Sequence, residues 1–274
     1  MKIHILILIV ILMSACQTVP QEQLNHIGCQ EGEIETDTCV IAENNNVGMF
    51  EQELNVESED VDLGFLAKPK EEGNYPGVVM IHEWWGLNEN VKEMAKILAN
   101  EGYIVLAVDL YEGMVAADSD KARELVTSVR NNPSKAIDTM KMVVSYLKEV
   151  QNVQKVASLG WCFGGQQSLQ ISLNDQLDAS VIYYGHLIDD KEQLKNIQGP
   201  VLGIFGEEDQ SISVESVKGF EKALNELNIE NEIYIYPGVG HAFANPSGSN
   251  YAKEETMDAW EKTTEFLEMN LKGE

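Results

Sequence analysis

Two periods of hydrophobic positions alternate along most of this chain. Short continuous apolar runs, of which 77–81 and 201–205 are the clearest, predict strands that are buried on both faces of a sheet. Between such runs, apolar residues recur every three or four positions, as at Val91, Ala95 and Leu98, which predicts helices that bury one face. The pattern predicts strands at 50–56, 61–67, 77–81, 103–108, 153–159, 179–184, 201–205 and 232–236, and helices at 88–100, 118–130, 134–150, 166–173, 214–227 and 251–271.

This alternation predicts an α/β fold, in which helices cover both faces of a mostly parallel sheet. The chain has 274 residues, and 44% of them are hydrophobic, which is enough for the core of one such domain. The sequence contains no internal repeat and no glycine fingerprint of a nucleotide-binding fold. We therefore expect a single α/β domain at 50–274.

The N-terminal pattern is that of a targeting signal. Nine apolar residues at 5–13 follow Lys2 and are too few to span a bilayer as a helix. Small residues then precede Cys16, which resembles a bacterial lipoprotein signal with a signal peptide at 1–15 and a lipid on Cys16. An ordinary secretory peptide or an uncleaved anchor is the alternative. We predict an exported lipoprotein, anchored in a membrane at the periplasmic face or the cell surface.

Residues 16–49 are predicted to form an acidic and polar tether, because they include few large apolar side chains. Cys29 and Cys39 lie in this segment and would be able to form a disulfide outside the cytoplasm. Two free thiols are the next alternative, and zinc is the last, since only His26 lies nearby as a further ligand. We therefore expect no metal site here.

The net charge of −26 limits the partners of the protein. A field of this sign repels DNA and RNA, so nucleic acid is excluded as a partner. It also mildly disfavours an anionic substrate. The simplest role of the acidic surface is to keep an exported protein soluble.

A nucleophile is predicted at Cys162, within the sequence Gly-Trp-Cys-Phe-Gly-Gly at 160–165. A strand precedes this sequence and a helix follows it, which is the context in which Gly-x-nucleophile-x-Gly forms a sharp turn. The helix dipole at that turn favours a thiolate. The alternative is a small apolar cysteine beside a glycine-rich turn.

Two further residues complete the order nucleophile, acid, histidine that α/β-hydrolases use. Asp209 follows the predicted strand 201–205, and His241 lies in a glycine-rich loop after the strand 232–236. Glu207 and Glu208 compete with Asp209 for the role of the acid. The carboxyl ends of parallel strands meet at one edge of the sheet, so we expect a Cys-His-Asp triad there.

These motifs make the chain similar to the dienelactone hydrolase family over residues 50–274. The marks are the cysteine turn, Gly-x-x-Asp at 206–209, Gly-x-x-His-x-Phe at 238–243, and Ile-His-Glu-Trp-Trp-Gly-Leu-Asn at 81–88. The resemblance implies an α/β-hydrolase fold and a catalytic domain that cleaves a small-molecule ester or lactone through an acyl-enzyme, with no cofactor.

The resemblance also implies roles for other residues. Glu83 would contact the resting thiol and help to deprotonate it. The backbone N–H groups of Trp84 and Phe163 would form the oxyanion hole. Tyr111 matches a family position near the substrate. Trp85 is a candidate for the same pocket, with simple packing as its alternative.

The chain departs from the family at the two arginines that hold the carboxylate of dienelactone. Gly113 and Asn245 stand at those positions, and Arg123 and Arg130 are predicted to lie on a helix surface. The physiological substrate and the oligomeric state therefore stay open. His82 is predicted to have a structural role. His186 follows a predicted strand and is a minor candidate for the edge of the cleft. The alternative functions are a non-catalytic binding lipoprotein on an α/β-hydrolase scaffold and a cell-surface interaction protein.

Overall fold

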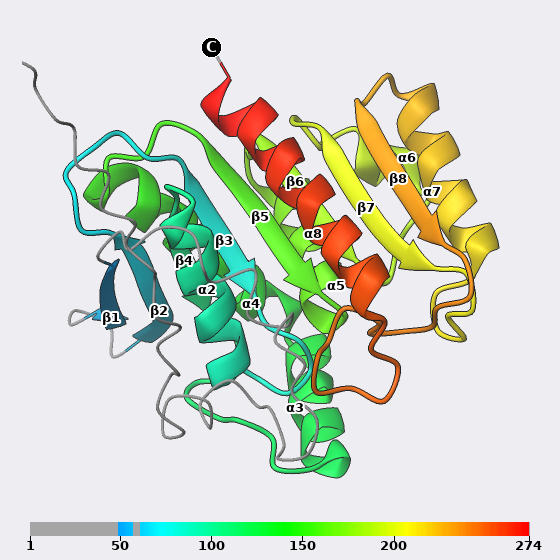
Figure 1. The fold of residues 1–274 in the computed structure, drawn as a ribbon, viewed down its shortest axis with the longest axis horizontal. Coiled ribbons are helices and arrows are strands. Elements are labelled where there is room, and N and C mark those ends of the chain that lie inside the picture. Colours follow the sequence, from blue (N-terminus) through cyan, green and yellow to red (C-terminus); the bar gives the residue numbers. More distant parts are fainter. Residues whose placement is uncertain (1–48, 57–60, 274) are drawn as a thin grey trace, which may run out of the picture. The chain divides into compact units, whose positions relative to one another are not determined.

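A computed structural model of the protein describes residues 49–56 and 61–273. The predictions for Cys16, Cys29 and Cys39 concern residues outside this part of the chain. The strands are β1 (Met49–Val56), β2 (Val61–Pro69), β3 (Gly77–Ile81), β4 (Ile104–Val108), β5 (Val156–Trp161), β6 (Ala179–Tyr183), β7 (Val201–Gly206) and β8 (Asn231–Tyr236). The helices are α2 (Glu89–Asn100), α3 (Ser119–Asn131), α4 (Pro133–Ser145), α5 (Phe163–Asn174), α6 (Lys191–Leu194), α7 (Val214–Glu226) and α8 (Lys253–Leu267), with π-helical turns η2 (Tyr146–Val150) and η3 (Glu268–Lys272) (Figure 1).

The described strands form one sheet in the order β1-β2-β4-β3-β5-β6-β7-β8. Neighbours pair in parallel from β4 to β8, whereas β2 runs antiparallel to both β1 and β4. The predicted mostly parallel sheet is confirmed. Because parallel strands end at the same edge, the loops after β3, β5, β6, β7 and β8 meet there.

Helices cover both faces of the sheet (Figure 1). On one face, Ala95 of α2 and Phe266 of α8 share a core with Met80 of β3. On the other face, Met140 of α4 packs in a core with Ile81. The consecutive residues Met80 and Ile81 therefore point to opposite layers, as the two-residue period of a strand requires. All of β3 is buried, which explains why its sequence is apolar throughout.

Several elements differ from the sequence prediction. The helix predicted at 166–173 begins earlier, at Phe163, because the turn at the nucleophile leads directly into it. The helices predicted at 134–150 and 251–271 each end in a π-helical turn, which hydrophobic spacing does not distinguish from an α-turn. The four-residue helix α6 was not predicted, since so short a helix shows no period. In the described ranges, no helix combines the length and the apolar composition that crossing a membrane requires.

Candidate active site

Cys162 occupies a sharp turn between β5 and α5. Its backbone angles are φ 55° and ψ −115°, a conformation that L-residues rarely adopt. The turn needs glycine on both sides, because a Cβ on Gly160 would lie 2.2 Å from the carbonyl oxygen of Gly164. A Cβ on Gly164 would in turn lie 2.2 Å from the carbonyl oxygen of Ile81. The two glycines thus allow α5 to start against the ends of β3 and β5, with Cys162 at its N-terminus.

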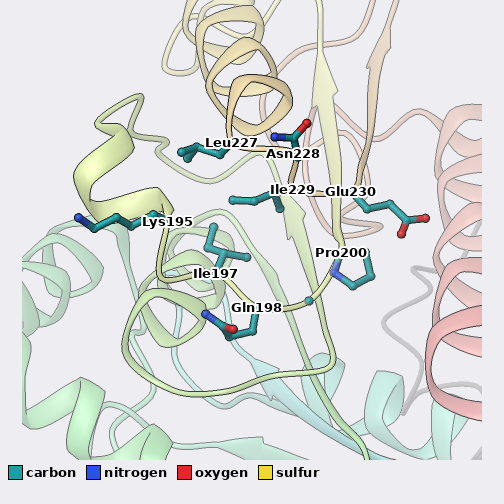
Figure 2. Close-up of a pocket in the computed structure, with 9 residues that line it drawn as sticks. Lys195, Ile197, Gln198, Pro200, Leu227, Asn228, Ile229 and Glu230 are labelled. Atoms are coloured by element: carbon teal, nitrogen blue, oxygen red, sulfur yellow. The ribbon is translucent and has the colours of Figure 1, made fainter.

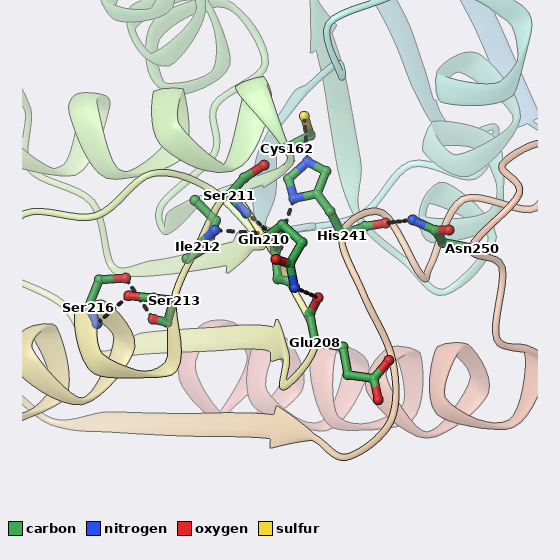
Figure 3. A network of polar contacts seen from close by, with 10 residues as sticks. Cys162, Glu208, Gln210, Ser211, Ile212, Ser213, Ser216, His241 and Asn250 are labelled. Atoms are coloured by element: carbon green, nitrogen blue, oxygen red, sulfur yellow. Dashed lines mark hydrogen bonds and ion pairs between the residues drawn. The ribbon is translucent and has the colours of Figure 1, made fainter.

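Three predicted residues come together at the carboxyl edge of the sheet. The Sγ atom of Cys162 lies 3.1 Å from Nε2 of His241, and Nδ1 of His241 lies 2.7 Å from Oδ2 of Asp209. Figure 3 shows the imidazole between the thiol and the loop that follows β7. Cys162 is partly exposed, and 28% of the His241 side chain is exposed, so the pair is open to a small molecule.

The Asp209 carboxylate is fixed by its own loop. Its Oδ1 atom accepts hydrogen bonds from the backbone N–H groups of Ser211 (2.7 Å) and Ile212 (3.0 Å), which leaves Oδ2 for His241. Burial opposes the charged form, but these three hydrogen bonds dominate and lower the pKa of Asp209. The competing carboxylates, Glu207 and Glu208, are exposed to solvent, and the carboxylate paired with His241 is that of Asp209.

The contacts of His241 with Asp209 and Cys162 favour its protonated form. Burial alone would lower its pKa, but the hydrogen bonds to Asp209 and Cys162 and their charges raise the pKa of His241 to about 10. Its carbonyl oxygen accepts a hydrogen bond from Asn250 (2.9 Å), which ties the loop to the next turn. Across the neutral range, the raised pKa of His241 therefore favours the imidazolium form.

Glu83 lies beside this pair, and its hydrogen bond goes to another residue. Its Oε2 atom accepts from the Nδ2 group of Asn245 at 2.5 Å, while the thiol of Cys162 contacts His241. Burial raises the pKa of Glu83 to about 7, against the opposing charge of His241 and the hydrogen bond from Asn245. The role of Glu83 toward the resting thiol stays a prediction.

The two predicted oxyanion donors are the backbone N–H groups of Phe163 and Trp84. Phe163 is the first residue of α5, whose leading N–H groups have no partner within the helix. In the described part of the chain, neither the N–H of Phe163 nor that of Trp84 has a hydrogen-bond acceptor. The rings of His82 and Phe163 stack at 5.7 Å, which brings the loop after β3 onto the start of α5.

His82 is structural, as predicted. It is fully buried, its Nε2 atom accepts from the N–H of Leu110 (3.3 Å), and its Nδ1 group donates to the carbonyl of Glu83 (2.6 Å). The acceptor role of Nε2 requires the neutral ring, and burial lowers the pKa of His82 accordingly. His82 thereby ties together the loops after β3 and β4. The other candidate, His186, is exposed.

Tyr111 and Trp85, the two predicted pocket residues, lie in loops that contact each other. Tyr111 is 2% exposed, and its hydroxyl has no hydrogen-bond partner among the described residues, although the charge of Cys162 acts on it. The ring of Trp85 is partly buried and lies 4.8 Å from that of Trp84. The carbonyl of Trp85 accepts from the N–H of Ala116 (2.8 Å), which joins the loop after β3 to the loop that carries Tyr111.

The positions that depart from the family have local explanations. Gly113 has φ +82° and helps to close the turn after β4, where its N–H donates to Oδ2 of Asp109 (2.5 Å). Asn245 donates to Glu83. Arg123 and Arg130 lie on α3 with exposed side chains, as predicted.

Tyr184 is a residue of the site that the sequence analysis missed. It follows β6 with φ 33°, it is 1% exposed, and its hydroxyl has no hydrogen-bond partner in the described ranges. Its ring meets that of His241 edge to face at 5.3 Å, and burial together with the nearby Glu83 raises the pKa of Tyr184. The signal was the end of a strand at Tyr-Tyr-Gly, next to a predicted catalytic strand.

A separate hollow of about 440 Å³ lies at the opposite, amino-terminal end of β7 and β8 (Figure 2). None of the triad residues lines it. Within the described ranges, no group of three or more histidine, cysteine or carboxylate side chains is arranged to hold a metal ion. The lining residues of the hollow are Lys195, Ile197, Gln198, Gly199, Pro200, Leu227, Asn228, Ile229 and Glu230.

Known proteins share both the sequence and the fold. The model of the dienelactone hydrolase family matches residues 63–271. "Protein usf" of Aquifex pyrophilus is 35% identical over 217 residues, which cover 76% of this chain and 93% of that protein. A Saccharolobus solfataricus protein named "Putative carboxymethylenebutenolidase" is 31% identical over 255 residues, which cover 80% of this chain and 98% of that protein.

A solved structure agrees in fold. The dienelactone hydrolase-like promiscuous phosphotriesterase from metagenomic libraries matches with a TM-score of 0.74 at 22% identity, over 81% of this chain and 98% of that chain. Fold and relatives together define an α/β-hydrolase that acts on carboxylic esters. The chain belongs to the dienelactone hydrolase family.

Proposed function

We propose that this hydrolase cleaves a small ester or lactone through an acyl-enzyme on Cys162. The observation that carries the proposal is the chain of contacts from the thiol to His241 (3.1 Å) and from His241 to Asp209 (2.7 Å). Nucleophile, base and orienting acid within hydrogen-bond reach are the arrangement that acyl transfer needs.

In the first half of the reaction, the Cys162 thiolate attacks the carbonyl carbon of the substrate. The negative charge moves to the carbonyl oxygen, where the N–H groups of Phe163 and Trp84 stabilise it; one such donor is worth about 3 kcal/mol. The tetrahedral intermediate then collapses to a thioester. The leaving alcohol takes the proton of the His241 imidazolium.

In the second half, His241 accepts a proton from water, and the resulting hydroxide attacks the thioester. The acid leaves and the thiolate–imidazolium pair returns. Asp209 keeps the Nδ1 proton of His241 in place throughout. Because a thiolate is itself a good leaving group, activated esters and enol lactones are expected to react faster than simple alkyl esters. Tyr111 and Trp85 are proposed to line the substrate pocket.

The test measures hydrolysis of phenyl acetate and of the aryl lactone dihydrocoumarin by the full chain and by Cys162→Ala. Iodoacetamide labelling, located by mass spectrometry, reports on the thiol independently of turnover. We expect Cys162→Ala to lose hydrolysis at least a thousandfold, with the label of the unmodified protein at Cys162. Hydrolysis that survives in Cys162→Ala would contradict the proposed nucleophile.

We also propose that the protein is exported and held on a membrane by a lipid on Cys16. The support is the signal-like sequence at 1–16, with its short apolar run and the small residues before the cysteine. A Cys16→Ser variant is expected to lose palmitate incorporation and to leave the membrane fraction. Equal labelling of both forms would refute the anchor.

A further inference from the structure

The carboxylate of Glu83 is held by a side chain whose orientation is itself fixed. The Oδ1 atom of Asn245 accepts a hydrogen bond from the N–H of Ser247 (2.9 Å), so its Nδ2 group must face the other way. That group donates to Oε2 of Glu83 at 2.5 Å. The backbone of Asn245 is anchored as well, because its N–H donates to the carbonyl of Ala242 (3.0 Å). Asn245 is therefore a preformed donor aimed at Glu83.

The surroundings of Glu83 make its position consequential. The titratable groups that face it are His241 from the loop after β8 and Tyr184 from the end of β6, with Cys162 near both. A carboxylate free to turn toward Cys162 would compete with His241 for the thiol proton and would repel a thiolate. Asn245 is a neutral donor, so it fixes the carboxylate without cancelling its charge.

We propose that Asn245 is a positioning residue that holds Glu83 away from the Cys162 thiol and so keeps the thiol paired with His241 before substrate arrives. The inference rests on the proposed function, because it concerns the reactivity of the same nucleophile. It assigns Asn245 no contact with the reacting atoms. Its effect must therefore pass through Glu83, and this dependence can be measured.

The test is a cycle of four full-length proteins: the unmodified chain, Asn245→Ala, Glu83→Gln and the double variant. The rate of iodoacetamide alkylation of Cys162 is measured from pH 5 to pH 10, together with kcat/KM for phenyl acetate. We expect Asn245→Ala to slow alkylation at pH 8 about tenfold, the effect of losing one hydrogen bond to a charged group. In the Glu83→Gln background, the same change should alter the rate less than twofold.

A matched variant separates positioning from loop folding. Asn245→Asp keeps an oxygen for the N–H of Ser247 but replaces the donor to Glu83 with a second negative charge. It should slow alkylation at least as much as Asn245→Ala. The titration of Glu83 should give the alkylation rate an inflection near pH 7, and Glu83→Gln should lack it. In both Asn245 variants this inflection should move to higher pH, because each loses the donor that favours ionised Glu83.

Two results would overturn the inference. In the first, Asn245→Asp is alkylated at the rate of the unmodified protein. In the second, Asn245→Ala lowers the alkylation rate by the same factor in the unmodified and in the Glu83→Gln background. Failure of the proposed function looks different: the unmodified protein would show no label at Cys162, or Cys162→Ala would still hydrolyse esters.

Discussion

Replacing Asp209 with asparagine tests how much of the reactivity of the site depends on a fixed imidazolium. The change preserves the shape of the side chain. An asparagine oxygen is still able to accept from the N–H groups of Ser211 and Ile212, so the loop after β7 should keep its fold. The amide NH₂ would then face Nδ1 of His241, where the structure has an acceptor at 2.7 Å. Two donors in that position repel, so the ring must change tautomer or turn away.

The expected size of the effect follows from the pKa of His241. Its rise from the ordinary 6.5 to about 10 corresponds to about 5 kcal/mol of preference for the imidazolium. Asp209 and Cys162 share this preference. If Asp209 supplies about half of it, its loss leaves the thiolate less stable by about 2–3 kcal/mol, or roughly a hundredfold in rate. Burial lowers the pKa of His241, and without Asp209 fewer interactions offset this effect.

The assay is kcat/KM for phenyl acetate at pH 7.5, with the alkylation rate of Cys162 beside it. Both should fall roughly a hundredfold in Asp209→Asn, while thermal unfolding stays close to that of the unmodified chain. Glu208→Gln is the matched control, because Glu208 is an exposed carboxylate in the same loop. It should leave both rates unchanged. If Asp209→Asn alkylates within threefold of the unmodified protein, the carboxylate does not hold the imidazolium and the reasoning fails.

The remaining predictions concern the scaffold. Gly164→Ala, whose Cβ would lie 2.2 Å from the carbonyl of Ile81, should cost about 3 kcal/mol and lower Tm by roughly 6–12 °C. Gly113→Ala, with open space around its Cβ but φ +82°, should cost only about 1 kcal/mol; equal losses in the two would argue against the close approach. His82→Gln should reduce Tm most at pH 8 and least near pH 5. Burial lowers the pKa of His82, so its neutral form stabilises the fold fully above about 6.5, and this contribution is lost as the pH falls; a loss that grows toward acid pH would refute this.

The sheet and the order of the triad were predictable because each has a local signal. A strand buried on both faces must be apolar throughout, so 77–81 and 201–205 stand out in the sequence. Cys162 and Asp209 each follow a fully buried strand, whereas His241 follows β8, the partly buried strand at the edge of the sheet. Because parallel strands end at one edge of the sheet, the strand order alone predicts that Cys162, Asp209 and His241 lie close together.

The state of Glu83 was not predictable in the same way. Its partner Asn245 lies 162 residues away in the chain, in a loop with no periodic pattern. Whether the thiol faces Glu83 or His241 depends on rotamers and on which hydrogen bonds compete, and neither leaves a trace in residue spacing. Sequence reasoning identified position 245 only as a missing arginine. In the structure, the amide of Asn245 donates to Glu83 and accepts from the N–H of Ser247.

Backbone strain in the site is concentrated at the ends of two neighbouring strands. Cys162 has φ 55° after β5 and Tyr184 has φ 33° after β6, and the N–H of Cys162 donates to the carbonyl of Tyr183 (3.0 Å). Residues in such conformations cost about 1–3 kcal/mol each and persist only where the surrounding structure fixes them. Here the close packing at Gly160 and Gly164 fixes the start of α5. The Tyr184 N–H donates to the carbonyl of Ile204 in β7 (2.8 Å). The same constraints place the Cys162 thiol and the Tyr184 ring against His241. The strained conformations therefore serve to orient these two side chains.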